Sequence, residues 1–262
     1  MKNVPFSKPE DLMVPKSRMP NAAEWAALLF AMTFPTCVSF LNFIVFGSGM
    51  PEMQQIVYSS GKVLQFLFPL IWVLGFCGER FDWRFWRHCR SFTPEVKRGI
   101  CEALIFGVLL ITAAVGGYEL LFKSFEVFQN AAGKINEQLD KIGIVGFWPY
   151  VMMTLLFSFP HAFLEEYYFR WFVFGRLRRK MTFAPAMLIS SLSFSAHHLI
   201  VMGVYFGWDN PWAYFLAFST GFGGAIWCWI YERSGSLLCI WIAHVLADIA
   251  VFWTGWLIIS NS

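Results

Sequence analysis

The sequence predicts an all-α fold, a polytopic bundle of seven or eight transmembrane helices. Of its 262 residues, 57% are hydrophobic and only 14% are charged, and the mean hydropathy is +0.53. A soluble domain usually carries nearly twice this charged fraction. The apolar residues also come in long runs, and about 20 such residues are enough to cross a bilayer once. A large soluble helical core would need polar faces on its helices, and most segments here have none.

Seven apolar segments follow one another along the chain. The second is short unless it extends back through Ile56. We expect residues 1–24 to form a cytoplasmic N-terminal segment and residues 25–259 to form a single integral membrane domain. The predicted spans are 25–46, 63–77, 100–122, 145–174, 181–205, 212–231 and 237–259.

The placement of basic residues predicts the orientation of the chain. Fifteen lysines and arginines fall in the N-terminal segment and in the loops after the second, fourth and sixth spans. The opposite side is assigned only four lysines, Lys62, Lys123, Lys134 and Lys141. Cytoplasmic loops are richer in Lys and Arg. We therefore expect a cytoplasmic N-terminus in a cell (inner) membrane and, with seven spans, an outside C-terminus. An eighth, re-entrant or split helix would place the C-terminus on the cytoplasmic side instead.

Two segments between the apolar spans have distinctive sequence patterns. Residues 79–98 interleave Trp, Phe and Arg. This pattern is typical both of an amphipathic stretch at the inner headgroup layer and of an ordinary basic loop. Residues 123–141 predict a short helix on the outer side.

Composition and motifs also limit the partners. The net charge is only +3, and the basic residues are dispersed over short loops. A nucleic-acid-binding protein would carry them on one clustered face, so we expect the lipid bilayer, and not a nucleic acid, to be the partner. The chain has no CxxC pair, no HExxH, no G-x-S-x-G and no glycine-rich phosphate loop. We expect no cofactor and no metal; the sequence leaves the oligomeric state open.

The fourth span contains charged residues, which are costly inside a bilayer and therefore need a partner or a task. It reads PHAFLEEYYFRWF, with His161, Glu165, Glu166 and Arg170. Glu166 and Arg170 are four residues apart on one helical face and can form an ion pair. Glu165 points about 140° away from Arg170, given 100° per residue, and shares a face with His161. One carboxylate is thus held by arginine, while the other is free to face a cavity.

Two further spans carry histidines. Phe194 and His198 lie four apart in the fifth span, with His197 turned 100° away. His244 and Asp248 lie four apart in the seventh. If the three spans converge, a carboxylate can take a proton from water while imidazoles position the water or stabilise an oxyanion. Inert ion pairs and packing histidines remain open as the alternative, as does a zinc site made by Glu165, His198 and His244.

These residues resemble a known family. Residues 165–170, EEYYFR, match the E-E-x-x-x-R motif of the CAAX protease and bacteriocin-processing (CPBP) membrane family, which includes the type II CAAX prenyl endopeptidases. Phe194 and His198 match its F-x-x-x-H motif, and His244 and Asp248 match H-x-x-x-N or a relative of it. The resemblance covers about residues 145–259, the catalytic part.

The resemblance implies a glutamate-dependent, metal-independent intramembrane endopeptidase. By position, Glu165 and His198 would activate water, and His244 with residue 248 would form the oxyanion site. Glu166 and Arg170 would support Glu165. The chain departs from the pattern at Asp248, where Asn is usual, and at Trp171, where bacterial relatives usually carry Gly. Asp donates a hydrogen bond only when protonated, so Asp248 can instead orient His244.

The substrate that the resemblance implies is a peptide or protein in the membrane, with a prenylated C-terminal peptide as one form. The alternative function is a non-catalytic membrane scaffold, immunity or transport protein that keeps the same fold. A metallo-hydrolase is the third hypothesis, and it rests on the zinc-compatible residues.

Overall fold

A computed structural model describes residues 19–47, 50–79 and 92–261 of the chain. Within these residues every regular element is helical, and seven helices are long and apolar enough to cross a membrane. The prediction of an all-α membrane bundle is therefore confirmed. Most of the N-terminal segment 1–24 lies outside the described residues, and so does most of the Trp- and Arg-rich stretch 79–98.

The first three spans continue past their α-helices into wider, π-helical turns. The first consists of α1 (Asn21–Phe40) and η1 (Leu41–Val45), and the second of α2 (Pro51–Leu70) and η2 (Ile71–Phe76). The third is made of α4 (Pro94–Ile111), η3 (Thr112–Gly116) and η4 (Tyr118–Phe122). The second span thus extends back well beyond Ile56. The assignment of Lys62 to an outside loop was wrong, because the helix begins at Pro51 and places Lys62 within the span.

The fourth span changes its helical pitch several times. It runs through α6 (Phe147–Leu156), η5 (Phe157–His161), α7 (Ala162–Glu166), η6 (Tyr167–Phe174) and α8 (Gly175–Arg178). Pro160 lies in the first π-helical stretch, where it has no backbone N–H to donate to the preceding turn. Such wide turns are frequent at functional sites. Here they flank the short α7, which carries Glu165 and Glu166.

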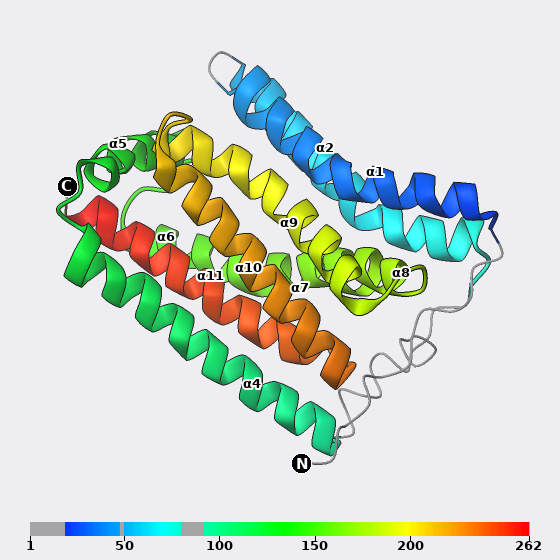
Figure 1. The fold of residues 1–262 in the computed structure, drawn as a ribbon. Helices are drawn as coiled ribbons and strands as arrows, with labels where there is room; N and C mark the ends of the chain where they lie inside the picture. Colours follow the sequence, from blue (N-terminus) through cyan, green and yellow to red (C-terminus); the bar gives the residue numbers. More distant parts are fainter. Residues whose placement is uncertain (1–18, 48–49, 80–91, 262) are drawn as a thin grey trace.

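The last three spans are uninterrupted helices, α9 (Phe183–Phe206), α10 (Pro211–Ser234) and α11 (Leu237–Ser260). In Figure 1, α4, α11, α10 and α9 lie next to one another, and the hairpin of α1 and α2 packs along α9. The predicted helix in 123–141 is present as α5 (Glu126–Lys141). It packs against α9 and α11 through Phe128 and Ala132.

The ends of the spans alternate as predicted. The start of α1, the end of α2, the start of α4, α8 and the end of α10 all lie at one end of the bundle, and α5 and the C-terminus lie at the other (Figure 1). The described basic loops therefore share one end, which we call the α8 end. That this end faces the cytoplasm stays a prediction from the positive-inside rule.

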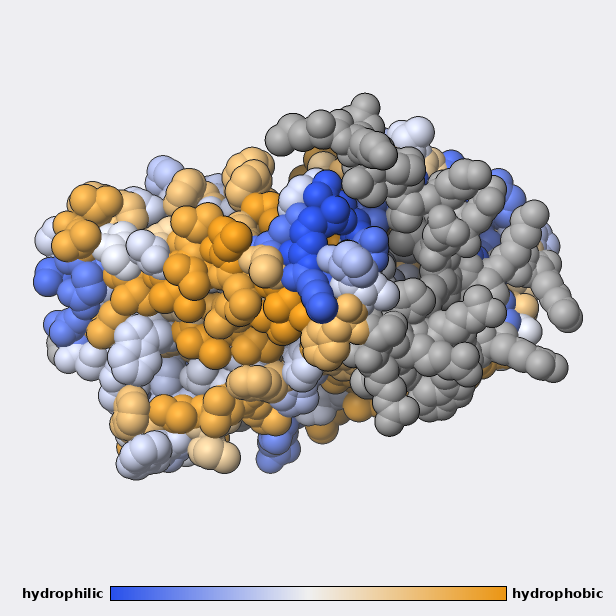
Figure 2. Space-filling view, turned by 90° about the horizontal axis from the view of Figure 1, so that it is seen from below, coloured by the Kyte–Doolittle hydropathy of each residue, from blue (hydrophilic) through white to orange (hydrophobic). Residues whose placement is uncertain are grey.

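The outside of the bundle is apolar, as a lipid-facing surface requires. Figure 2 shows a broad hydrophobic area on one face, with hydrophilic side chains confined mainly to its margins. On α4 the exposed large side chains are aliphatic, among them Leu104, Ile105, Val108 and Leu109. The chain is an integral membrane protein.

The α8 half of the fourth span forms the centre of the bundle. All residues from Glu165 to Arg178 are buried, whereas most of α6 is exposed or half-buried. Tyr168, Phe169, Phe172 and Phe174 contribute to the main hydrophobic cluster together with residues of α1, α9, α10 and α11. The span that carries the two glutamates is therefore held on all sides by other helices.

Two buried arginines of α8 tie this span to its neighbours. Arg176 donates hydrogen bonds to Glu24 of α1 and to Glu79 just after the second span, both at 2.9 Å. Burial raises the pKa of the Glu79 carboxyl, and the guanidinium groups of Arg176 and Arg179 oppose this effect. Arg178 donates to both carboxylate oxygens of Glu232 on α10, at 2.7–3.2 Å. Buried charges are normally paired in this way.

Candidate active site

Glu165 lies at the centre of a buried polar cluster. Its carboxyl side chain is 5% exposed. Its Oε1 atom is 3.3 Å from Nε2 of His161, one turn earlier on the same span. The same oxygen is 3.8 Å from the Lys62 ammonium of α2 and 3.6 Å from Nε2 of His197 on α9. Oε2 is 3.8 Å from Nε2 of His244 on α11. Four spans thus meet at one carboxylate.

The predicted ion pair of Glu166 and Arg170 is present, with Nη1 3.0 Å from Oε1. Both side chains are almost completely buried. The Arg170 guanidinium also lies over two aromatic rings, 4.4 Å from the centroid of Phe194 and 4.9 Å from that of Trp227. A guanidinium over an aromatic face gains electrostatic attraction from the ring. Arg170 is therefore held on several sides and holds Glu166 in turn.

His244 lies between carboxylates at both ring nitrogens. Nδ1 is 2.6 Å from Oε1 of Glu166, and Nε2 is 3.4 Å from Oδ1 of Asp248. The ring stacks on Trp227 with the centroids 4.3 Å apart. Asp248 thus lies where it can orient His244, the role that the sequence allowed for an aspartate at this position. The imidazole is fixed in position and in ring plane.

The two adjacent histidines of α9 both reach the cluster. Nδ1 of His198 is 2.9 Å from the carbonyl oxygen of Phe194. This contact places the proton on Nδ1 and leaves Nε2 able to accept a hydrogen bond. The His197 and His198 rings are 4.1 Å apart. Helical periodicity predicted that His197 turns away from His198, yet ligand atoms of both histidines lie within 4.8 Å of the Glu165 carboxylate.

Every predicted site residue is therefore in one region: Glu165, Glu166, Arg170, Phe194, His198, His244 and Asp248. The sequence reasoning missed three neighbours, Lys62, His197 and Trp227. Lys62 was missed because the second span was predicted to begin at residue 63. His197 was set aside in favour of His198. Nothing in the sequence separates Trp227 from the other tryptophans.

A metal ion would find a different set of ligands from the one considered in the sequence. Ligand atoms of Glu165, His197 and His198 all lie within 4.8 Å of one another. Imidazole nitrogens and carboxylate oxygens are among the atoms that zinc binds. The Lys62 ammonium beside Glu165 places a positive charge at the same carboxylate. This charge opposes cation binding.

Gly224 of α10 leaves the space that Arg170 occupies. A Cβ atom at this position would be 2.8 Å from Nη2 of Arg170 and 3.3 Å from the Phe194 ring. Gly224→Ala is therefore expected to lower stability by about 1–3 kcal/mol through overpacking. Thermal unfolding of the detergent-solubilised protein measures the effect. Gly116→Ala, at a helical position with no heavy atom near the added Cβ, is the matched control. Equal stability of the two variants would contradict the packing role of Gly224.

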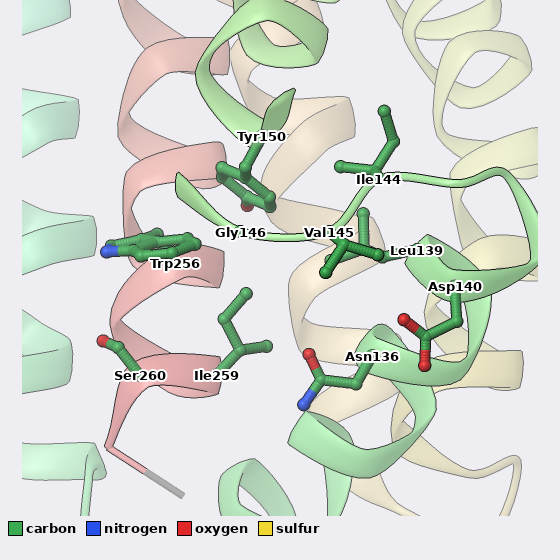
Figure 3. A pocket seen from close by; sticks show the side chains of 10 residues that line it. All are labelled: Asn136, Leu139, Asp140, Ile144, Val145, Gly146, Tyr150, Trp256, Ile259 and Ser260. Atoms are coloured by element: carbon green, nitrogen blue, oxygen red, sulfur yellow. The ribbon is translucent and has the colours of Figure 1, made fainter. Parts of the chain in front are cut away.

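A separate pocket lies between α5, the loop before α6, and the end of α11 (Figure 3). Tyr150, Trp256 and Asp140 are among the residues that line it. It shares no lining residue with the Glu165 cluster. It is therefore not part of the candidate active site.

Comparison with known proteins gives one family match, over the segment that carries the candidate site. Residues 147–250 match the family model described as Rce1-like, type II CAAX prenyl endopeptidase. No curated protein and no solved structure matches the chain. The match covers 104 of the 262 residues and includes all seven predicted site residues. The fold and the site thus define a helical membrane protein with a buried glutamate–histidine cluster. Residues 147–250 thus resemble the Rce1-like CAAX proteases, as the sequence motifs predicted, and this match supports a CAAX-protease-type membrane endopeptidase in general.

Proposed function

We propose that the protein is an intramembrane glutamic endopeptidase in which Glu165, together with His198, activates the hydrolytic water. One observation carries the proposal. Glu165 is buried, is not bound to the arginine of its own helix, and faces imidazoles from two other spans. A buried carboxylate that faces imidazoles is suited to general base catalysis.

In the proposed reaction, Glu165 takes a proton from water as the water oxygen attacks the peptide carbonyl carbon. The carbonyl π electrons move to oxygen and form a tetrahedral oxyanion. Glu165 then returns the proton to the leaving nitrogen as the C–N bond breaks, and the products are a carboxylic acid and an amine. His198 accepts a hydrogen bond from the water through Nε2, because its Nδ1 is occupied by the Phe194 carbonyl.

His244 is the proposed oxyanion stabiliser, acting through its positive charge because both of its N–H groups are directed at carboxylates. Its two nitrogens face Glu166 and Asp248, and two ionised acceptors are satisfied together only by the doubly protonated imidazolium. An imidazolium fixed in a site shielded from water stabilises a developing negative charge. In this proposal, Asp248 orients His244 and does not itself donate a hydrogen bond, which accommodates its replacement of the usual Asn. Arg170 holds Glu166 in place.

The proposed substrate is a membrane-associated protein cleaved near a lipid-bearing or membrane-embedded C-terminus. The family description names prenyl endopeptidases, and the apolar outer surface keeps the chain within the same bilayer as such a substrate. We also propose that the protein lies in the cell membrane with its N-terminus on the cytoplasmic side.

The purified protein in liposomes is expected to cleave a farnesylated C-terminal CAAX peptide. Product masses measured by mass spectrometry would give the cleaved bond, and the unprenylated peptide and a transmembrane peptide would serve as comparison substrates. Because the mechanism needs no metal, 1,10-phenanthroline should leave the rate unchanged. Loss of activity with the chelator and recovery with zinc would overturn the glutamic mechanism in favour of a metallo-hydrolase. Absence of cleavage of all three peptides would favour a non-catalytic membrane protein.

A further inference from the structure

Lys62 brings a positive charge into the membrane span next to the proposed base. It belongs to α2, which lies outside the segment that matches the family. Its Nζ atom is 3.8 Å from Oε1 of Glu165, and its side chain is only 17% exposed. The ammonium also lies 5.8 Å from the Tyr58 ring centroid and 5.6 Å from that of Phe66. A lysine in such a position is expensive to bury without a task.

Arg170 cannot supply a positive charge to Glu165 as Lys62 does. Arg170 is directed to Glu166 at 3.0 Å, and helical geometry turns Glu165 away from it. His161 and His197 also approach Glu165, but an ordinary imidazole is only partly protonated near neutral pH. The two N–H groups of His244 are directed to Glu166 and Asp248.

We propose that Lys62 is a positioning residue that keeps Glu165 ionised and oriented as the general base. This inference rests on the proposed function of Glu165 and extends it to a helix outside the family domain. An opposite charge within about 4–6 Å favours the ionised form of a carboxyl group. In a span shielded from water this interaction is screened less than at a surface. The N-terminal half of the chain thereby takes part in setting the chemistry of the C-terminal half.

Several other titratable or charged groups lie near Glu165 or contact its neighbours, and they also affect its protonation. They lie on its own span and on each of the three helices packed against it. They are His161 and Glu166 on the fourth span, Tyr58 on α2, His197 and His198 on α9, and His244 with Asp248 on α11. The test therefore changes Lys62 alone and measures the pH at which Glu165 becomes active.

The first experiment measures peptide cleavage against pH for the native protein and for Lys62→Met. Without the ammonium, Glu165 is protonated at higher pH, so the acid limb of the profile should move upward by about 1–3 pH units. Above the limb, activity should return toward the native value. Lys62→Arg, which restores a cation, should bring the limb back toward its native position. Lys134→Met, on the exposed side of α5, is the matched control.

Two results would overturn the proposal. A fall in rate by the same factor at every pH would indicate a structural role for Lys62. A raised KM with an unmoved acid limb would indicate that the ammonium binds the substrate. If Lys62→Met does not fold, Lys62→Gln is measured in its place, because it keeps a polar group in the span.

An infrared titration keeps this inference separate from the proposed function. Protonated Glu165 gives a carboxylic acid carbonyl band that is missing in Glu165→Gln, and this band needs no turnover. In Lys62→Met the band should appear at higher pH than in the native protein. An unmoved band would overturn the role of Lys62 even if Glu165 proves essential. A shifted band in a protein without cleavage would support the Lys62 pairing while the proposed function fails.

Discussion

Glu165→Gln is expected to abolish measurable cleavage, lowering kcat by about 10²–10⁴-fold or more while the protein remains folded and inserted. Glutamine has nearly the same shape and can still interact with His161 and Lys62 across the cluster. Its amide cannot take a proton from water, so the activating step is lost while the packing is kept. The effect should therefore appear in kcat and leave KM nearly unchanged.

The measurement is a steady-state assay in liposomes, with thermal unfolding as the folding control. Glu119→Gln is the matched variant, because Glu119 is a partly exposed carboxylate paired with Lys123 on the third span. It should retain the native rate. Full activity of Glu165→Gln would refute the assignment of Glu165 as the base. Equal loss in both variants would mean that the assay reports a general disturbance.

Arg178→Met is expected to give the largest loss of stability, about 3–5 kcal/mol, because it leaves a buried carboxylate without its partner. Arg178 is 6% exposed and Glu232 is 1% exposed, and three hydrogen bonds join them. The pair joins α8 to α10 at the end of the bundle where the fourth span turns toward α9. The readout is the unfolding free energy or the apparent Tm in detergent.

A double variant separates the pair from the single charge. Arg178→Met with Glu232→Leu removes both charges, and it should recover much of the lost stability, since a well-packed apolar pair can replace a buried ion pair. Lys123→Met, which breaks an exposed pair with Glu119, should change stability by less than about 1 kcal/mol. A double variant as unstable as Arg178→Met would show that packing, and not the unpaired charge, causes the loss.

Contacts within one helix could be predicted from spacing alone. Glu166 and Arg170 pair as expected, and His161 meets Glu165 one turn away. His244 and Asp248 also approach each other as their spacing predicts. The reason is that α-helical geometry places residues four apart on one face, whatever surrounds the helix. Even the wide turns of the fourth span did not break these pairs.

Contacts between helices could not be predicted in the same way. The pairing of Glu166 with His244, the stacking of Trp227 on that ring, and the approach of Lys62 to Glu165 join segments far apart in the chain. Each depends on the rotation and depth of one helix against another. Sequence spacing does not specify these quantities, because they follow from side-chain packing between spans.

The sequence by itself determined the all-α membrane class, the number of long apolar segments and the three motifs of the site. These follow from hydrophobic length and from helical periodicity, which are local properties. Only the tertiary structure decided that four spans meet at Glu165, that His197 stands beside His198 in the cluster, and that a lysine from the first half of the chain completes it. Buried polar groups need partners, and packing in three dimensions decides which residues supply them.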